Sequence, residues 1–301
     1  MVQPMSSPLA FGAMQCGGRA DAAQSMAMLH ACLDAGITHF DTAWVYTDGR
    51  SESLVGQFAR GRAVQVATKI GYTGGAGRTN LAAQFDQSRK RLDCPVDLLY
   101  LHRFDPEVPL EESLEPLARW QSDGLIARIG LSNFAAWQVM KAQAVAQRLG
   151  TRIDAIQPMY SLVKRQAEVE ILPMAADQGI AAYTYSPLGG GLLSGKYATG
   201  GAGRLNEDAR YAARYAPDYM HRAAADLAAL AAELGAHPAT LAVAWAKCHP
   251  AGPIPLISAR SIEQLAPSLA AAEYPMTAET YARISALAPA PPPATDRLEE
   301  A

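Results

Sequence analysis

A short, almost continuous apolar run stands at Val64-Gln65-Val66-Ala67-Thr68-Lys69-Ile70-Gly71. It is too short for a typical helix, and it lacks the polar–apolar alternation of a strand with one face in water. Runs of this kind are typical of strands in a parallel sheet that is covered on both faces. The stretch therefore predicts a buried parallel strand with the cationic Lys69 near its end.

Similar runs recur along the chain, and most of them are separated by amphipathic or alanine-rich segments. The predicted strands are Leu9–Met14, Thr38–Ala43, Val64–Gly71, Asp97–Arg103, Ala127–Asn133, Ala155–Ser161, Ile180–Pro187 and Ile254–Ser258. The predicted helices are Asp21–Ala35, Thr79–Leu92, Leu110–Asp123, Phe134–Leu149, Gln166–Gln178, His221–Leu234, Pro238–Lys247, Ser261–Ala272 and Thr277–Leu287. This order predicts right-handed β-α-β units in an α/β fold, and eight units favour a closed (β/α)8 TIM barrel. A doubly wound open sheet is the alternative that periodicity leaves open.

No long linker or break in composition divides the 301 residues, so we expect a single domain over 1–301. The last predicted helix is one more than eight β/α units require. The proline- and alanine-rich residues 289–301 are expected to form a loosely held tail.

Composition narrows the classes of function. The formal net charge is −3 and both signs are spread along the chain, which argues against nucleic-acid or anionic membrane partners. The four cysteines are scattered and the histidines lack metal-ligand spacing, so we expect reduced thiols and no metal site. The N-terminus shows no signal-peptide pattern, which favours a cytoplasmic protein that acts on a small molecule. The oligomeric state stays open.

Ionisable side chains stand at the ends of three successive predicted strands. Asp41, Lys69 and His102 would all face the mouth of a barrel, where barrel enzymes carry their chemistry. Each has an ordinary structural explanation alone: a turn cap, a solvated strand end or a buried core histidine. Together they favour one site in which neighbouring charges and burial shift each other's pKa.

Several ordered motifs around these residues resemble a known family. They are Phe40-Asp41-Thr42-Ala43-Trp44-Val45-Tyr46, Ala67-Thr68-Lys69, Leu99-Tyr100-Leu101-His102-Arg103, Gly130-Leu131-Ser132-Asn133-Phe134, Gln157-Pro158-Met159-Tyr160-Ser161 and Tyr185-Ser186-Pro187-Leu188-Gly189-Gly190-Gly191-Leu192-Leu193-Ser194-Gly195-Lys196-Tyr197. The set spans about Leu9 to Leu287 and resembles the aldo-keto reductase family. The last two motifs are most similar to the branch of bacterial general-stress aldo-keto reductases and potassium-channel β-subunits.

The resemblance implies an NADP-dependent oxidoreductase that reduces an aldehyde or ketone to an alcohol by hydride transfer. Tyr46 matches the general acid, and Lys69 matches the cation that favours its phenolate. Asp41 would hold Lys69 charged and oriented, and His102 would hydrogen-bond the substrate oxygen. The same resemblance leaves an alternative, a cofactor-sensing regulatory subunit with slow or vestigial reductase activity.

The resemblance also implies the residues of the cofactor site. They are Gly12, Met14, Ser132, Asn133, Gln157, Tyr185, Ser186, Pro187, Leu188, Gly190, Lys196, Ser258, Arg260 and Gln264. The resemblance implies that Ser132, Asn133 and Gln157 hold the nicotinamide carboxamide and that Tyr185 stacks on its ring. The loop from Ser186 to Gly190 with Lys196 would hold the pyrophosphate. Ser258, Arg260 and Gln264 would form the adenosine site, where Arg260 would bind the 2′-phosphate that distinguishes NADP(H). Pro267 and Ser268 stand where the family usually has an acid and an asparagine, which leaves NAD(H) open as the preferred cofactor.

Two further expectations concern the barrel mouth. Trp44, Tyr72 and Phe104 follow strand ends and are expected to line the substrate pocket, with packing under loops as the alternative. Residues 198–217 are expected to be a long loop that covers the cofactor as a lid. These patterns name neither the physiological substrate nor the preferred direction of reaction.

Overall fold

Eight parallel strands form a closed barrel in the computed structural model, which describes residues 8–197, 201, 203–297 and 299. The strands are β1 (Ala10–Gly12), β2 (His39–Asp41), β3 (Gln65–Ile70), β4 (Val96–Leu101), β5 (Ile126–Ser132), β6 (Ala155–Gln157), β7 (Ala181–Tyr185) and β8 (Ile254–Ile257). Each strand pairs in parallel with the next, and β1 also pairs with β8, which closes the ring. The structure thus confirms the (β/α)8 barrel and rules out the open sheet.

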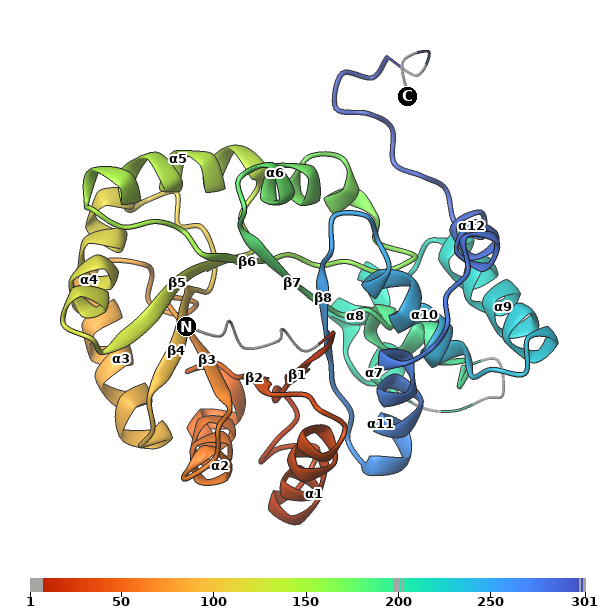
Figure 1. Ribbon diagram of the computed structural model, residues 1–301, viewed down its shortest axis with the longest axis horizontal. Helices are drawn as coiled ribbons and strands as arrows, with labels where there is room; N and C mark the ends of the chain where they lie inside the picture. The colour runs from red at the N-terminus through yellow and green to blue at the C-terminus, as the bar shows by residue number, and fades with distance from the viewer. Residues whose placement is uncertain (1–7, 198–200, 202, 298, 300–301) are drawn as a thin grey trace.

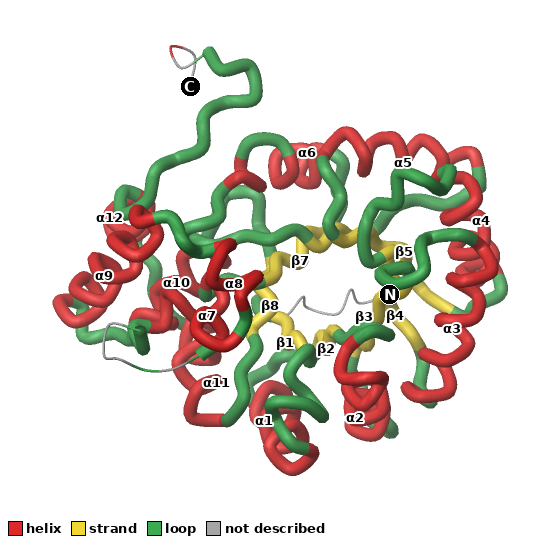
Figure 2. Tube along the Cα trace, turned by 180° about the vertical axis from the view of Figure 1, so that it is seen from behind, coloured by secondary structure: helices red, strands yellow, loops and turns green. Residues whose placement is uncertain are grey.

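Helices surround the barrel on its outside (Figures 1 and 2). They are α1 (Ala22–Asp34), α2 (Arg50–Ala59), α3 (Arg78–Leu92), α4 (Leu110–Ser122), α5 (Ala136–Arg148), α6 (Ile171–Asp177), α7 (Arg204–Glu207), α8 (Ala209–Arg214), α9 (Asp218–Glu233), α10 (Pro238–Lys247), α11 (Ile262–Leu269) and α12 (Ala278–Ser285). Apolar side chains fill the layer between strands and helices, because a parallel sheet in a barrel is covered on its outer face. The C-terminal segment after α12 extends away from this body (Figure 1).

Two segments differ from the sequence predictions. No helix was predicted between the second and third strands, yet α2 lies there and buries the polar Ser51 and Glu52. The prediction of a long loop over 198–217 was wrong for its described part, which contains α7 and α8; residues 198–200 and 202 lie outside the described residues. The Asp208 side chain accepts a hydrogen bond from the Arg210 backbone and so caps the start of α8.

Inward-facing side chains pack a second, smaller cluster inside the barrel. Its buried members are Ala10, Ala67, Leu98, Tyr100, Ala155, Tyr183 and Leu256. Small and large residues alternate here, because the interior of an eight-stranded barrel is a packed core and not a pore. Gly130 is required opposite Tyr100, since a Cβ on Gly130 would overlap the Tyr100 ring. This packing forms the floor beneath the polar strand ends.

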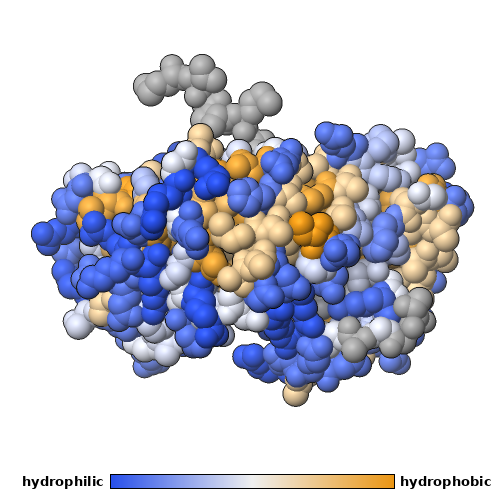
Figure 3. Space-filling model, turned by 90° about the horizontal axis from the view of Figure 1, so that it is seen from below, coloured by the Kyte–Doolittle hydropathy of each residue, from blue (hydrophilic) through white to orange (hydrophobic). Residues whose placement is uncertain are grey.

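The outer surface is mixed in character, and Figure 3 shows hydrophilic side chains around a central apolar area on one face. Within the described residues, no single helix has the length and apolar composition needed to cross a membrane. In the described part of the chain, one pair of helices, α9 and α10, meets those criteria when taken together, and the two helices are bent by 102° at the break between them.

Candidate active site

A buried ion pair lies at the carboxyl ends of β2 and β3. The Lys69 Nζ donates hydrogen bonds to the Asp41 Oδ1 and to the Thr42 carbonyl oxygen, the latter over 2.8 Å. From β6, across the barrel, the Gln157 amide donates to the Asp41 Oδ2 over 2.9 Å. The Lys69 side chain is fully buried and that of Asp41 is 4% exposed. The barrel therefore brings two residues, 28 positions apart in the chain, into one charged pair.

Burial and the partner's charge act in opposite directions on this pair. Burial lowers the pKa of Lys69 from its ordinary value, and the Asp41 carboxylate opposes that shift. Burial likewise raises the pKa of Asp41, against the Lys69 ammonium and the Gln157 amide. Charges this deep persist because they neutralise each other and are hydrogen-bonded.

Two further ionisable rings stand over the pair. Tyr46 begins the short 3₁₀ turn η1 (Tyr46–Gly49), and its ring centroid is 5.1 Å from the Lys69 Nζ. The His102 ring follows β4 and lies edge-on to Tyr46, 5.9 Å between centroids. The structure thus places Asp41, Tyr46, Lys69 and His102, called the tetrad below, together at the barrel mouth.

His102 is held as a neutral imidazole. Burial lowers its pKa to about 3, and the charges of Lys69 and Arg103 act in the same direction. Its Nδ1 is buried without a hydrogen-bond partner among the described residues. A neutral imidazole donates a hydrogen bond through one ring nitrogen and accepts one through the other, and it carries no charge into the site.

The residues predicted to hold the nicotinamide form a hydrogen-bonded group beside His102. The Tyr185 hydroxyl donates to the Asn133 Oδ1 over 2.7 Å, and the Asn133 amide donates to the His102 carbonyl oxygen over 3.0 Å. The Ser132 hydroxyl donates to the Gln157 carbonyl oxygen over 3.1 Å. Asn133 has a φ of 59°, an uncommon conformation for a residue other than glycine that concentrates at functional sites.

The segment predicted to hold the pyrophosphate is a left-handed backbone loop after β7. Ser186, Gly189, Gly190 and Gly191 have φ values of 61°, 56°, 65° and 98°. A Cβ on Gly190 would lie 3.0 Å from the rings of Tyr211 and Tyr215, and one on Gly191 would lie 3.2 Å from the Lys196 Nζ. The loop therefore combines a left-handed backbone with a nearby ammonium group. That combination fits a phosphate-bearing cofactor.

Glu207 of α7 joins the two sides of the predicted adenosine site. Its carboxylate accepts from Arg260 (Nη2 to Oε2, 2.8 Å) after β8 and from Arg19 (Nη1 to Oε2, 2.8 Å) after β1. The Arg260 backbone in turn donates to the Gln264 side chain over 3.4 Å, while Ser258 is exposed. Two guanidinium groups thus converge on one anionic oxygen.

The two positions that depart from the family pattern lie in α11. Ser268 is buried at 1% exposure, and the Pro267 carbonyl oxygen accepts a hydrogen bond from the Thr240 hydroxyl over 2.7 Å. This bond joins α11 to α10.

The three residues predicted to line the substrate pocket differ in their surroundings. The Tyr72 ring lies 4.9 Å from that of His102 and is 42% exposed. The Phe104 ring packs against Phe134 and Trp137, whereas the Trp44 indole donates to the Gln87 side chain of α3 over 3.0 Å. Of the three, Tyr72 is the one placed against a tetrad residue by these ring contacts.

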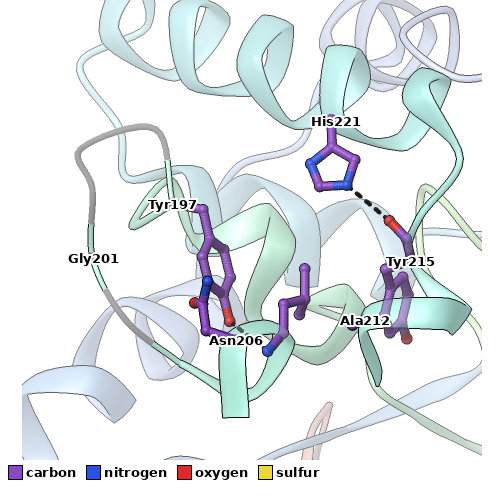
Figure 4. Close-up of a pocket in the computed structure, with 7 residues that line it drawn as sticks. Tyr197, Gly201, Asn206, Ala212, Tyr215 and His221 are labelled. Carbon is purple, nitrogen blue, oxygen red and sulfur yellow. Dashed lines mark hydrogen bonds between the residues drawn. The ribbon is translucent and has the colours of Figure 1, made fainter. Parts of the chain in front are cut away.

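A cavity of about 440 Å³ lies beside α7 and α8 (Figure 4). It is lined by Tyr197, Gly201, Leu205, Asn206, Ala212, Tyr215 and His221, a set that includes none of the predicted site residues. Its wall is held by a hydrogen bond between the His221 Nε2 and the Tyr215 carbonyl oxygen, 2.9 Å apart. The chemistry of the barrel mouth is therefore separate from this cavity.

Four charged residues were not predicted from the sequence: Glu52 and Arg91, which pair between α2 and α3, and Glu207 and Arg19, which pair beside Arg260. A charged residue in a helix that follows a strand of the site does not by itself indicate that the residue belongs to the site. Their pairing depends on which helices and loops become neighbours in space.

Comparison with known proteins agrees with this geometry. The model of the aldo/keto reductase family matches residues 8–289. The chain is 37% identical over 203 residues to "Aflatoxin B1 aldehyde reductase member 2" of Rattus norvegicus, covering 64% of this chain and 55% of the rat protein. It is therefore matched to about half the length of such mammalian relatives.

Two longer matches cover most of this chain and most of the related protein. A "Probable voltage-gated potassium channel subunit beta" of Oryza sativa is 35% identical over 270 residues, 81% of this chain and 80% of the rice protein. The "Uncharacterized oxidoreductase YrpG" of Bacillus subtilis is 32% identical over 308 residues, 95% of this chain and 93% of that protein. With its closed barrel and its family match over nearly the whole length, the chain belongs to the aldo/keto reductase family, a family of oxidoreductases that use nicotinamide cofactors.

Proposed function

We propose that this protein reduces aldehydes or ketones to alcohols with NADP(H), using Tyr46 as the general acid. The observation that carries the proposal is the buried Asp41–Lys69 pair beneath the Tyr46 ring, with a neutral His102 at its side. The family match and the similarity to a protein named an aldehyde reductase support the carbonyl class of substrate.

Each of the four residues has a role that follows from its surroundings. Tyr46 donates its hydroxyl proton to the carbonyl oxygen as that oxygen gains negative charge. The Lys69 ammonium stabilises the phenolate left behind, and Asp41 keeps that ammonium in place. His102, neutral at physiological pH, donates one hydrogen bond to the same oxygen and fixes its position. When bound, the reduced nicotinamide supplies the hydride that the carbonyl carbon accepts.

The residues proposed to hold the cofactor extend from the tetrad to Arg260. Asn133, Gln157 and Ser132 would hold the carboxamide, Tyr185 would stack on the ring, and the loop from Ser186 to Gly190 with Lys196 would hold the pyrophosphate. Arg260 and Arg19 converge on one oxygen of Glu207, and such a pair of guanidinium groups suits a 2′-phosphate. This arrangement favours NADP(H) over NAD(H).

The segment that includes α7 and α8 is the proposed cover of this cofactor. Glu207 bridges the loops after β1 and β8 through its ion pairs with Arg19 and Arg260, so we expect these bonds to open when the cofactor enters and leaves. We therefore propose that α7 and α8, within residues 198–217, form the lid.

The first experiment is NADPH oxidation at 340 nm by the purified protein against aromatic, aliphatic and sugar aldehydes, with fluorescence titration of NADPH and NADH in parallel. Turnover with tighter binding of NADPH supports the proposal. Arg260→Met is expected to remove the preference for NADPH and leave NADH binding unchanged. Failure to bind either cofactor would contradict the assignment.

A second function is favoured by one comparison. The 35% identity to a predicted potassium-channel β-subunit over 81% of the chain supports a cofactor-sensing regulatory subunit. That function predicts tight NADPH binding with turnover too slow to measure on every aldehyde. Rapid turnover on any member of the panel would contradict it.

A further inference from the structure

A second buried ion pair lies directly behind the tetrad, between α2 and α3. The Glu52 side chain is completely buried, and the Arg91 side chain is 26% exposed. The Arg91 Nη1 donates to the Glu52 Oε2 over 3.1 Å, and the Thr68 hydroxyl donates to the Glu52 Oε1 over 2.7 Å. A carboxylate without solvent contact is stable only with such partners, so this pair is a fixed part of the fold.

The same guanidinium also holds the segment that leads into Tyr46. The Arg91 Nη1 donates to the Trp44 carbonyl oxygen over 3.1 Å, and the guanidinium carbon lies 5.7 Å from the Trp44 ring centroid. The Trp44 indole is tied to α3 by its own bond to Gln87. Both the backbone and the side chain at Trp44 are therefore anchored to α3, two residues before Tyr46.

The turn after Tyr46 is strained and packs against Arg91. Thr47 and Asp48 have φ values of 48° and 56°, and Gly49 has a φ of 86°. A Cβ on Gly49 would overlap the Arg91 guanidinium, so the turn and the arginine are in direct contact. Residues other than glycine adopt this conformation only where their surroundings enforce it.

The other end of the pair reaches the strand of Lys69. Thr68 and Lys69 are neighbours in β3, so their side chains point to opposite faces: Thr68 towards Glu52, and Lys69 into the barrel. The Trp44 backbone N–H donates to the Lys69 carbonyl oxygen over 3.0 Å. One ion pair thus contacts both the turn that carries Tyr46 and the strand that carries Lys69.

We propose that Arg91 and Glu52 are positioning residues for the reduction: they set the distance between the Tyr46 hydroxyl and the Lys69 ammonium. The proposal rests on the proposed role of Tyr46 as general acid. Arg91 is bonded to the Trp44 backbone and Glu52 to the Thr68 side chain, so the pair acts on the tetrad through the chain segments at Trp44 and Thr68. The Glu52 carboxylate also acts on Lys69 by its charge, which favours the ammonium form and opposes the lowering of the Lys69 pKa by burial. Displacement of a catalytic group by about 1 Å costs on the order of 100-fold in rate.

The protein supplies its own matched control. Arg165 and Glu168 form a partly buried ion pair with side chains 13% and 14% exposed, and the Arg165 guanidinium carbon lies 5.5 Å from the Trp245 ring centroid. This pair contacts the C-terminal part of the chain through bonds from Arg165 to the Ser285 and Ala288 carbonyl oxygens. Arg165→Gln therefore breaks a comparable pair away from the tetrad.

The test compares Arg91→Gln with Arg165→Gln in the full chain, at a temperature where both are folded. We expect kcat to fall by about 10- to 100-fold in Arg91→Gln and by less than about twofold in Arg165→Gln, with similar decreases in unfolding temperature. KM and the NADPH Kd should stay near their wild-type values in both. Arg91→Lys, which keeps the charge, should recover part of kcat.

Equal loss of kcat in the two glutamine variants, or an unchanged kcat in Arg91→Gln, would overturn the proposal. If Arg91→Gln fails to fold, Thr68→Val replaces it, because valine keeps the shape and removes one bond to Glu52. Hydrogen exchange of residues 44–49 gives a readout apart from activity: exchange should accelerate in Arg91→Gln and not in Arg165→Gln. If the wild type shows no turnover, the proposed function fails, and unchanged exchange would then refute the positioning role separately.

Discussion

Lys69→Met removes the buried ammonium while keeping a side chain of similar length. In the wild type, Lys69 is fully buried and Asp41 is 4% exposed, so the variant leaves the Asp41 carboxylate in the barrel with the Gln157 amide and no countercharge. Removing one partner of a buried ion pair costs about 3–5 kcal/mol. We therefore expect a loss of that size in the free energy of unfolding at pH 7.

The loss should depend on pH with a definite sign. Burial already raises the pKa of Asp41, and removal of Lys69 raises it further. A carboxyl with a folded pKa above its unfolded value of about 3.9 contributes stability at low pH and loses it as the pH rises through the folded pKa. The deficit of Lys69→Met should therefore shrink as the pH falls, by at most about 1.4 kcal/mol per pH unit, because the folded chain takes up a proton on Asp41 before the unfolded chain does.

Urea unfolding followed by tryptophan fluorescence at pH 5, 6 and 7 measures this dependence. The control is the double variant Asp41→Asn/Lys69→Met, which has neither charge and should recover part of the stability with little pH dependence. A deficit below about 1 kcal/mol, or one that is constant over these pH values, would refute the assignment of a stranded carboxylate.

Three further results are expected. Burial lowers the pKa of His39 to about 3, so the unfolded chain binds a proton below about pH 6.5 that the folded chain does not, and stability is lost as the pH falls from 6.5 towards 3. His39→Phe should therefore remove about 2 kcal/mol of the acid-induced loss at pH 5, which would bring the urea midpoint at pH 5 closer to that at pH 7. A difference between the two midpoints as large as in the wild type would argue against it. Gly130→Ala should destabilise the fold by about 1–3 kcal/mol in the same assay, because its Cβ would overlap the Tyr100 ring; Tyr100→Leu should relieve part of this, and an additive loss would be inconsistent with the overlap. Glu207→Gln should accelerate NADPH release in stopped-flow fluorescence, whereas an unchanged release rate would exclude Glu207 as part of a cover.

The sequence was sufficient for the eight strands and for the expectation that Asp41, Lys69 and His102 lie near one another, because both follow from local rules, whereas Tyr46 was assigned from the family resemblance. Short apolar runs indicated all eight strands, although the structure ends several of them one to four residues earlier than predicted, as in β6 (Ala155–Gln157). Asp41, Lys69 and His102 could be expected together because parallel strands in a barrel end at the same rim. That rule needs no knowledge of side-chain packing.

The missed features depend on contacts between distant segments. The helix α2 carries Glu52 on its buried face, which breaks the apolar pattern that marks a helix in sequence. Its carboxylate is stable there because Arg91 arrives from α3, 39 positions later. Gly56 permits that approach, since a Cβ on it would overlap the Leu92 carbonyl group. No local pattern contains this close approach of two helices.

The central claim is that Tyr46 supplies the proton, and the most direct measurement is kcat for Tyr46→Phe with the NADPH Kd determined on the same protein. We expect kcat to fall by about 100-fold or more with cofactor binding unchanged, since general acid catalysis contributes on that scale. A Tyr46→Phe variant that binds NADPH and reduces aldehydes at the wild-type rate would contradict it.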